Sequence, residues 1–243
     1  MNFYPNAFII YIELRDTEVR ALDKKFSRNI PSISADEQAL LRQKKAFVAG
    51  CGGLGGYICE YLVRAGVGAI VAADGDFFEE TNLNRQLLSL QSTLGVNKAF
   101  AAAKRAKEIN PEVEFTPFDE FFSAEKADAM LSGADIVIDA LDNPADRILL
   151  EEECGKRGLY LVHGAISGWN AQISVVKPHS GFLKALYAES APSPSSCLCP
   201  TPAACAALQA AEALKILCGK PSSLEGKMLL VDLFNMGFDI IEL

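Results

Sequence analysis

A glycine-rich segment, Gly-Cys-Gly-Gly-Leu-Gly over residues 50–55, follows a short apolar run and precedes a helical pattern of apolar residues. Glycines at this spacing permit a tight turn. They also let the backbone approach phosphate groups at a helix N-terminus, where free N–H groups and the helix dipole favour anions. Asp74 ends the next apolar run, about 20 residues further on, where a carboxylate can accept hydrogen bonds from both ribose hydroxyls. This order of strand, loop, helix, strand and acid predicts a nucleotide-binding βαβ unit.

Short apolar runs alternate with helical patterns along most of the chain. The predicted strands cover residues 46–50, 69–74, 113–117, 134–139 and 159–163. The predicted helices cover residues 54–65, 97–109, 123–131 and 145–157. Strands that alternate with helices form a parallel sheet with right-handed crossovers. We therefore expect an α/β fold, a Rossmann-like and mostly parallel sheet flanked by helices.

The pattern differs at the two ends of the chain. An apolar strand over residues 7–14, a charged helix over 15–28 and a capping box at Ser34 are predicted before the alternation begins. After residue 165 we predict strand and turn over 168–177, a loop over 187–203, a helix over 204–218 and strands over 227–241. These last segments are expected to form an antiparallel C-terminal part.

Composition limits the class of protein. The chain has 243 residues, of which 50% are hydrophobic and 22% charged, which excludes a disordered chain. Its formal net charge of −8 repels phosphate backbones, so we do not expect a nucleic-acid partner. The apolar stretch near the N-terminus is shorter than the about 20 residues that a membrane span needs. Seven cysteines, an odd number, argue against a disulfide scaffold, and we expect a cytoplasmic protein.

Basic residues follow Asp74, in a segment that ends with Asn-Leu-Asn-Arg-Gln at Gln86. The glycine loop alone does not distinguish NAD from ATP. A dinucleotide pyrophosphate rests on backbone N–H groups, whereas a triphosphate carries about four negative charges and needs cations. Arg85 offers a planar fork of donors and Lys98 a point charge. Together with Asn82 these bases favour ATP, and an NAD-binding oxidoreductase is kept as an alternative.

A third element, Asp-Ala-Leu-Asp-Asn over residues 139–143, ends a predicted buried strand. In open α/β sheets, ligands bind outside the carboxyl ends of the strands, where a carboxylate can hold Mg²⁺. Asp142 is therefore the metal candidate. Its alternative role is the N-cap of the helix over 145–157, which Asn143 or Asp146 could provide instead.

The order of these motifs resembles the ThiF/MoeB/HesA family, bacterial relatives of the ubiquitin-activating enzymes. The similarity extends from Phe26 to Asp232, and Asn-Leu-Asn-Arg-Gln is its most specific part. The resemblance implies a homodimeric enzyme that uses ATP and Mg²⁺ to adenylate the C-terminal glycine carboxylate of a small ubiquitin-like sulfur carrier, releasing pyrophosphate. It also implies an N-terminal extension over residues 1–25 and an adenylation domain over 26–243, with a crossover loop at about 186–203.

The resemblance assigns roles residue by residue. The glycines expected to cradle the nucleotide are Gly50, Gly52, Gly53 and Gly55. The side chains expected to bind its ribose and phosphates are Asp74, Asp76, Asn82, Arg85, Gln86 and Lys98. Asp142 is expected to bind Mg²⁺, and Arg28 to reach the γ-phosphate in the other subunit, although Asn follows it where the family usually has Gln. The residues expected to act in catalysis are Arg85, Lys98, Asp142 and Arg28, because adenylation needs positioning and charge neutralisation rather than a strong base.

The cysteines depart from the family pattern. Many members carry two Cys-x-x-Cys pairs that bind zinc, and this chain has none, so we expect no structural zinc. Cys197 and Cys199 lie in the predicted loop, where some relatives use a cysteine to take the activated carrier or to pass sulfur. A thiolate beside a helix N-terminus would be activated, whereas a buried thiol would only pack, and both interpretations stay open. His163 and His179 are expected to be packing or surface residues.

The leading prediction is a sulfur carrier protein adenylyltransferase whose carrier, ThiS-like or MoaD-like and ending in Gly-Gly, comes from another chain. The short loop favours a thiamine-type or general sulfur-carrier pathway. Related tRNA-modifying ATP-dependent dehydratases are an alternative, against which the net charge of −8 argues. A non-catalytic subunit should have lost the phosphate-binding residues, and the expected set is present in the chain.

Overall fold

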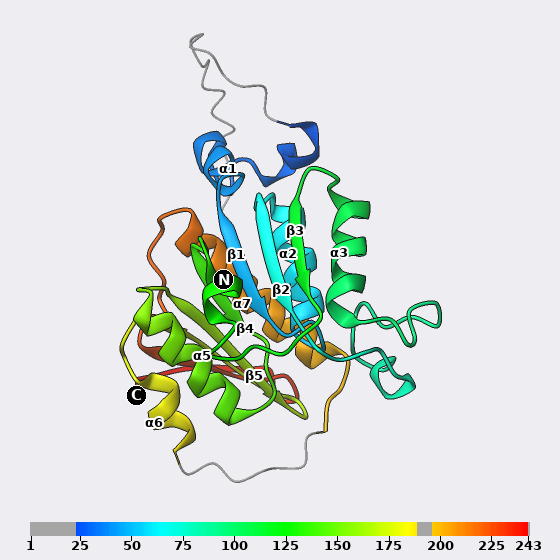
Figure 1. Ribbon diagram of the computed structural model, residues 1–243. Helices are drawn as coiled ribbons and strands as arrows, with labels where there is room; N and C mark the ends of the chain where they lie inside the picture. The colour runs from blue at the N-terminus through cyan, green and yellow to red at the C-terminus, as the bar shows by residue number, and fades with distance from the viewer. Residues whose placement is uncertain (1–22, 189–195, 243) are drawn as a thin grey trace, which may run out of the picture.

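An eight-stranded sheet forms the centre of the computed structural model, which describes residues 23–188 and 196–242 (Figure 1). The strands are β1 (Lys45–Ala49), β2 (Ala69–Ala73), β3 (Glu114–Phe118), β4 (Ile136–Asp139), β5 (Leu161–Ser167), β6 (Asn170–Val176), β7 (Lys227–Asp232) and β8 (Gly237–Glu242). The α-helices are α1 (Ala35–Leu41), α2 (Gly55–Ala65), α3 (Lys98–Ile109), α4 (Ala127–Leu131), α5 (Pro144–Lys156), α6 (Phe182–Tyr187) and α7 (Pro200–Leu217). Two 3₁₀ helices are η1 (Lys24–Asn29) and η2 (Glu80–Asn82).

The sheet has a parallel part and an antiparallel part. Its strand order is β3-β2-β1-β4-β5-β6-β7-β8. The pairs from β3 to β5 are parallel, and those from β5 to β8 are antiparallel. This confirms the predicted fold class. Because the carboxyl ends of parallel strands meet at one edge, the loops after β1, β2 and β4 lie together there.

The central strands are buried on both faces, so their side chains alternate between two hydrophobic cores. In β1, Ala46 and Val48 pack in one core, while Phe47 and Ala49 pack in the other. Helices α2, α3 and α7 supply residues to the first core and α4, α5 and α6 to the second. Figure 1 shows the two groups of helices on opposite sides of the sheet.

Several predicted elements change in extent. The capping box at Ser34 is present and begins α1, as predicted. The helix predicted over 123–131 is shorter and starts at Ala127. The loop predicted over 187–203 was wrong at its end, because α7 already begins at Pro200. Proline fits the first helical position, where its fixed φ matches the helix and its missing N–H is not needed.

Two further differences concern the segments before and after the alternation. Helix α6 was not predicted. Of the helix predicted over 15–28, the described part forms the 3₁₀ helix η1, and the predicted strand over 7–14 lies outside the described residues. The residues in the described ranges include no helix long and apolar enough to cross a membrane.

Candidate active site

The glycine loop joins β1 to α2, and its glycines serve two different purposes. Gly50 has φ +96°, and a Cβ there would lie 2.7 Å from the carbonyl oxygen of Ala140. A Cβ on Gly55 would lie 1.8 Å from the carbonyl oxygen of Gly50. These two positions therefore require glycine for the turn to close. At Gly52 and Gly53 the nearest atoms lie 3.6 Å or more from a built Cβ, so these two leave the backbone open to a ligand.

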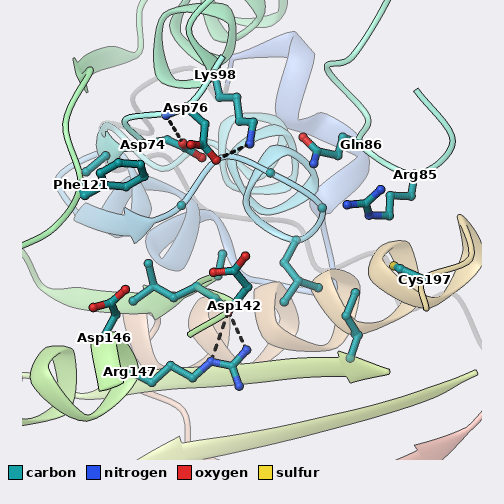
Figure 2. Close-up of a pocket in the computed structure, with 18 of the residues that line it drawn as sticks. Asp74, Asp76, Arg85, Gln86, Lys98, Phe121, Asp142, Asp146, Arg147 and Cys197 are labelled. Atoms are coloured by element: carbon teal, nitrogen blue, oxygen red, sulfur yellow. Dashed lines mark hydrogen bonds and ion pairs between the residues drawn. The ribbon is translucent and has the colours of Figure 1, made fainter. Parts of the chain in front are cut away.

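A cavity of about 770 Å³ opens in front of this loop, at the carboxyl ends of β1, β2 and β4. Figure 2 shows Asp74, Asp76 and Lys98 on one side of it, and Asp142, Asp146 and Arg147 on the other. The volume falls in the range of about 300–1,000 Å³ typical of small-molecule sites. The glycine loop, the acids and the bases singled out in the sequence thus meet in one place.

Asp74 directly follows β2 and is almost fully buried. Its carboxylate accepts hydrogen bonds from the backbone N–H groups of Cys51, at 2.7 Å, and Asp76, at 2.9 Å. Burial raises the pKa of Asp74 above its usual value, and the two N–H donors oppose that shift. The carboxylate is thereby fixed between the glycine loop and the cavity, where a ribose could bind.

Lys98 is the first residue of α3 and is also nearly buried. Its Nζ lies 2.8 Å from Oδ2 of Asp76, whose side chain is half exposed, and Figure 2 shows this ion pair. Asn97 caps the helix by accepting a hydrogen bond from the N–H of Ala99, and it donates to the carbonyl oxygens of Asp74 and Asp76. The cap therefore fixes both acids and the lysine beside the cavity.

Arg85 and Gln86 line the cavity from the segment after η2. The guanidinium of Arg85 donates to the carbonyl oxygen of Thr81 and to Oδ1 of Asn84, both at 2.9 Å. Gln86 is buried, and its Oε1 has no hydrogen-bond partner within the part of the chain that the structure describes. A buried polar atom of this kind calls for a partner, which a bound ligand can supply.

Asp142 follows β4 and lines the opposite side of the cavity. The cap of α5 is Asn143, whose Oδ1 accepts a hydrogen bond from the N–H of Ala145 at 2.8 Å. The carboxylate of Asp142 is therefore not used as the helix cap and stays exposed. Asp146 also lines the cavity, and its pKa is raised by burial and by the charge of Asp142.

The structure separates three predicted residues from the cavity lining. Asn82 is buried, and its Oδ1 accepts from the N–H of Glu79 at 3.1 Å, so it shapes η2. Gly55 closes the glycine turn. Arg28 is exposed on η1 and does not line the cavity of its own chain.

The residues that support the side of the cavity lined by Asp142 were not predicted from the sequence to have a role in the site. Arg147 lines the cavity and is nearly buried. Behind it, Asp139 and His163 are fully buried, with 2.6 Å between Oδ2 and Nδ1. Burial lowers the pKa of His163, so its imidazole is neutral near pH 7. His179 is exposed, as expected for a surface residue. Asp139 belongs to the motif over residues 139–143 that the sequence shows. Its partner His163 is too distant in the sequence for a local pattern to pair the two residues.

The two candidate thiols differ in position. Cys197 is half-buried and lines the cavity, and its carbonyl oxygen accepts from Nδ2 of Asn84 at 3.1 Å. Burial raises the pKa of the Cys197 thiol, and the charge of Arg85 opposes this shift. Cys199 is exposed at the start of α7 and is not among the lining residues. The geometry thus favours Cys197 for contact with a bound ligand.

A comparison with protein families identifies the chain. Residues 26–243 match the ThiF family. The chain belongs to the ThiF family. With this membership and the names of its relatives, the chain is an enzyme of the nucleotidyltransferase class.

Two curated relatives cover most of the chain. It is 32% identical to the SAMP-activating enzyme E1 of Haloferax volcanii, over 89% of this chain and 84% of that protein. It is 33% identical to the sulfur carrier protein adenylyltransferase of Thermus thermophilus, over 86% and 82%. Among solved structures, PaaA is similar, with a TM-score of 0.81 and 20% identity over 94% of this chain and 77% of that chain. At that identity the structural likeness shows the fold alone.

Proposed function

We propose that this ThiF-family enzyme transfers the adenylyl group of ATP to the C-terminal glycine carboxylate of a small ubiquitin-like sulfur carrier that ends in Gly-Gly. The observation that carries the proposal is the cavity, where an open glycine loop, a ribose-type acid and two bases meet. The names of two relatives support the carrier, since one is a SAMP-activating enzyme and the other a sulfur carrier protein adenylyltransferase. A thiamine-type carrier remains our preferred substrate over a molybdopterin-type carrier.

The residues present fit ATP. Gly52 and Gly53 place no side chain in the way of phosphates, and the helix α2 that follows offers an N-terminus. The carboxylate of Asp74 is the candidate for the ribose hydroxyls. Arg85 and Lys98 both line the cavity and supply positive charge for the phosphates.

The residues also fit Mg²⁺ that is shared with a nucleotide. No three His, Cys, Asp or Glu side chains group together to hold a metal within residues 23–188 and 196–242. In nucleotide sites, however, Mg²⁺ is usually held by one or two carboxylates together with phosphates and water. Asp142 is the residue that we propose to hold it, with Asp146 beside it. When bound, the ion would neutralise phosphate charge.

The proposed reaction needs positioning more than proton transfer. A carboxylate oxygen of the carrier attacks the α-phosphorus, a new P–O bond forms, and the bond to the β-phosphate oxygen breaks as pyrophosphate leaves. The attacking carboxylate is already ionised at pH 7, so no general base is required. Arg85 and Lys98 neutralise the charge that develops on the leaving group. This explains a site rich in Arg, Lys and Asp.

Two features of the proposed assembly extend beyond one chain. The carrier is a separate protein, and the enzyme acts as a homodimer in which Arg28 of one subunit reaches the phosphates in the other. The exposed position of Arg28 on η1 is compatible with such a contact. We further propose Cys197, ahead of Cys199, as the thiol whose thiolate attacks the carbonyl carbon of the carrier acyl-adenylate, so that a thioester forms and AMP leaves. Mass spectrometry of the enzyme after turnover would detect the adduct.

ATP–pyrophosphate exchange with candidate carriers ending in Gly-Gly tests the proposed function. We expect exchange with one carrier, and a loss of about 100-fold or more in Arg85→Ala and Asp142→Ala. Arg64→Ala is the matched control, because Arg64 is an exposed residue of α2 that pairs with Glu60 outside the cavity. No exchange with any carrier would count against the proposal, and adenylation of a tRNA-linked carboxylate would favour the dehydratase alternative. An NAD-binding oxidoreductase would bind NAD and tolerate both substitutions.

A further inference from the structure

Five side chains from five different elements meet behind the Asp142 side of the cavity. They are Asp139 at the end of β4, Arg147 on α5, His163 on β5, Gln172 on β6 and Tyr187 at the end of α6. Asp139 and His163 are completely buried, and Arg147 is 7% exposed. A buried carboxylate and a nearly buried guanidinium lose much hydration free energy, so apolar residues of similar volume would often stabilise the fold as well or better. The cluster therefore calls for an explanation other than stability.

The hydrogen bonds of the cluster run in one consistent direction. Because His163 is neutral, its Nδ1–H donates to Oδ2 of Asp139 at 2.6 Å, and its Nε2 is an acceptor. The hydroxyl of Tyr187 lies 3.1 Å from that Nε2 and can donate to it. The same hydroxyl accepts from Nη1 of Arg147 at 2.5 Å and from the amide of Gln172 at 2.9 Å. The chain of bonds thus links Asp139, through His163 and Tyr187, to Arg147, beside two further contacts: Nε of Arg147 lies 3.7 Å from Oδ2 of Asp139, and the amide of Gln172 lies 3.3 Å from Nε2 of His163.

Both ends of this chain of bonds hold the same residue, Leu141. The backbone N–H of Leu141 donates to Oδ1 of Asp139 at 2.9 Å. Its carbonyl oxygen accepts from Nε and Nη2 of Arg147, at 3.2 and 2.6 Å, the two bonds drawn beside Arg147 in Figure 2. Leu141 directly precedes Asp142, so the cluster fixes the peptide from which the Asp142 carboxylate projects into the cavity.

We propose that His163 and Tyr187 are positioning residues that hold the Asp142 segment in place without touching the substrate. Tyr187 keeps the Arg147 guanidinium turned toward Leu141, and His163 keeps both Tyr187 and Asp139 oriented. The role of the positioned carboxylate in catalysis rests on the function proposed above. The positioning itself is a property of the ligand-free protein, so it can be measured without any reaction.

Hydrogen exchange followed by mass spectrometry or NMR tests the positioning directly. In Tyr187→Phe the hydroxyl link is lost, and we expect the amide of Leu141 to exchange about tenfold faster, with amides of α2 unchanged. His163→Asn keeps a side-chain amide near Asp139 and removes the ring acceptor, so we expect a similar increase. Because both substitutions break one chain of bonds, the double variant should exchange no faster than either single variant. Tyr61→Phe, which removes a hydroxyl from α2, is the matched control.

A second measurement connects the cluster with the reaction. In ATP–pyrophosphate exchange, we expect Tyr187→Phe to raise the Mg²⁺ concentration for half-maximal rate several-fold while the KM for the carrier stays within twofold. A purely structural role would lower the melting temperature and the active fraction and leave that Mg²⁺ concentration unchanged. Unchanged exchange at Leu141 in both single variants would overturn the proposal. Faster exchange in an enzyme inactive with every carrier would instead retain the positioning and refute the proposed function.

Discussion

The two sides of the cavity are built in different ways. The first side, which comprises the glycine loop, Asp74, Asp76 and Lys98, comes from β1, β2 and the start of α3, and its side-chain hydrogen bonds join residues at most 23 positions apart. The second side, which comprises Asp142 and Arg147, depends on Tyr187, 40 positions from Arg147. The first side, which we propose to bind the nucleotide phosphates, is therefore built by one βαβ unit and the start of the helix that follows it. The segment that carries the proposed metal ligand depends on distant parts of the fold.

Among the predictions, a substitution in the glycine turn of the first side should have the largest effect on stability. In Gly55→Ala the new Cβ would meet the carbonyl oxygen of Gly50 at 1.8 Å, and backbone atoms cannot move aside as a flexible side chain can. We expect a loss of about 3 kcal/mol or more in the free energy of unfolding. In Gly53→Ala the nearest atom is 3.8 Å from the new Cβ, so the change should stay within about 1 kcal/mol.

Urea denaturation of both variants measures this difference. Nucleotide titration adds a second contrast, because a methyl group on Gly53 would stand where the backbone should approach phosphates. Gly53→Ala should therefore bind nucleotide more weakly while it folds normally. If Gly55→Ala were as stable as the wild type, the view that the first side is closed by its glycines would be wrong.

The same contrast explains how much of the molecule could be predicted from the sequence. Apolar runs that alternate with helical patterns gave the strands and helices of the parallel part, because buried parallel strands have a simple signal. The glycine loop and Asp74 are predicted together because strand, loop, helix, strand and acid follow one another in a βαβ unit, whereas Lys98 is predicted from its charge and from the family resemblance. Asn143 was recognised as a possible cap for α5, and it is the cap.

The second side could not be predicted in the same way. Helix α6 is short, and its last residue, Tyr187, gains its role only from its contacts with His163 and Arg147. The sequence around His163 contains no local pattern that would indicate whether this side chain only packs in the core or also forms hydrogen bonds with other side chains. The predicted start of α7 lies too late in the chain because prolines near residue 200 are typical of loops, although proline is also common in a first helical turn.

A substitution of Asp74 is the next test of the first side, and its expected effect, on ATP affinity, is smaller. In Asp74→Asn one acceptor for the ribose hydroxyls is lost, and we expect about tenfold weaker ATP binding, or about 1.4 kcal/mol. Burial raises the pKa of Asp74, so the wild-type carboxylate becomes protonated at a higher pH than an exposed aspartate does. The ratio of wild-type to variant affinity should therefore shrink as pH falls through that raised pKa.

Isothermal titration calorimetry at several pH values checks this expectation. The ratio between the two proteins is the useful quantity, because protonation of the nucleotide affects both alike. Asp119→Asn is the control, since Asp119 is exposed and does not line the cavity. A ratio that did not change with pH would show that the ionised Asp74 carboxylate does not contact the ribose.

The smallest expected effect is on how the free energy of unfolding changes with pH. Its sign differs between His163, behind the second side, and Asp74, on the first side. Burial lowers the pKa of His163 below its usual value, so the unfolded chain binds a proton more readily than the folded protein does. Between the folded and unfolded pKa values, stability therefore rises with pH and is lost as pH falls below about 6.5, by at most about 1.4 kcal/mol for each pH unit. Asp74 has the opposite sign, because its raised pKa makes the folded state bind the proton more readily in acid.

His163→Asn separates these two opposing contributions. The variant keeps Asp74 and lacks the titrating imidazole, so its free energy of unfolding should fall less between pH 7.5 and 5.5 than that of the wild type, by about 1 kcal/mol. Urea denaturation at each pH gives both slopes. Equal slopes would mean that His163 takes up its proton in the folded state as easily as in the unfolded chain. In that case burial in the folded protein would not lower the pKa of His163, and the two sides would not differ in the sign of their pH dependence.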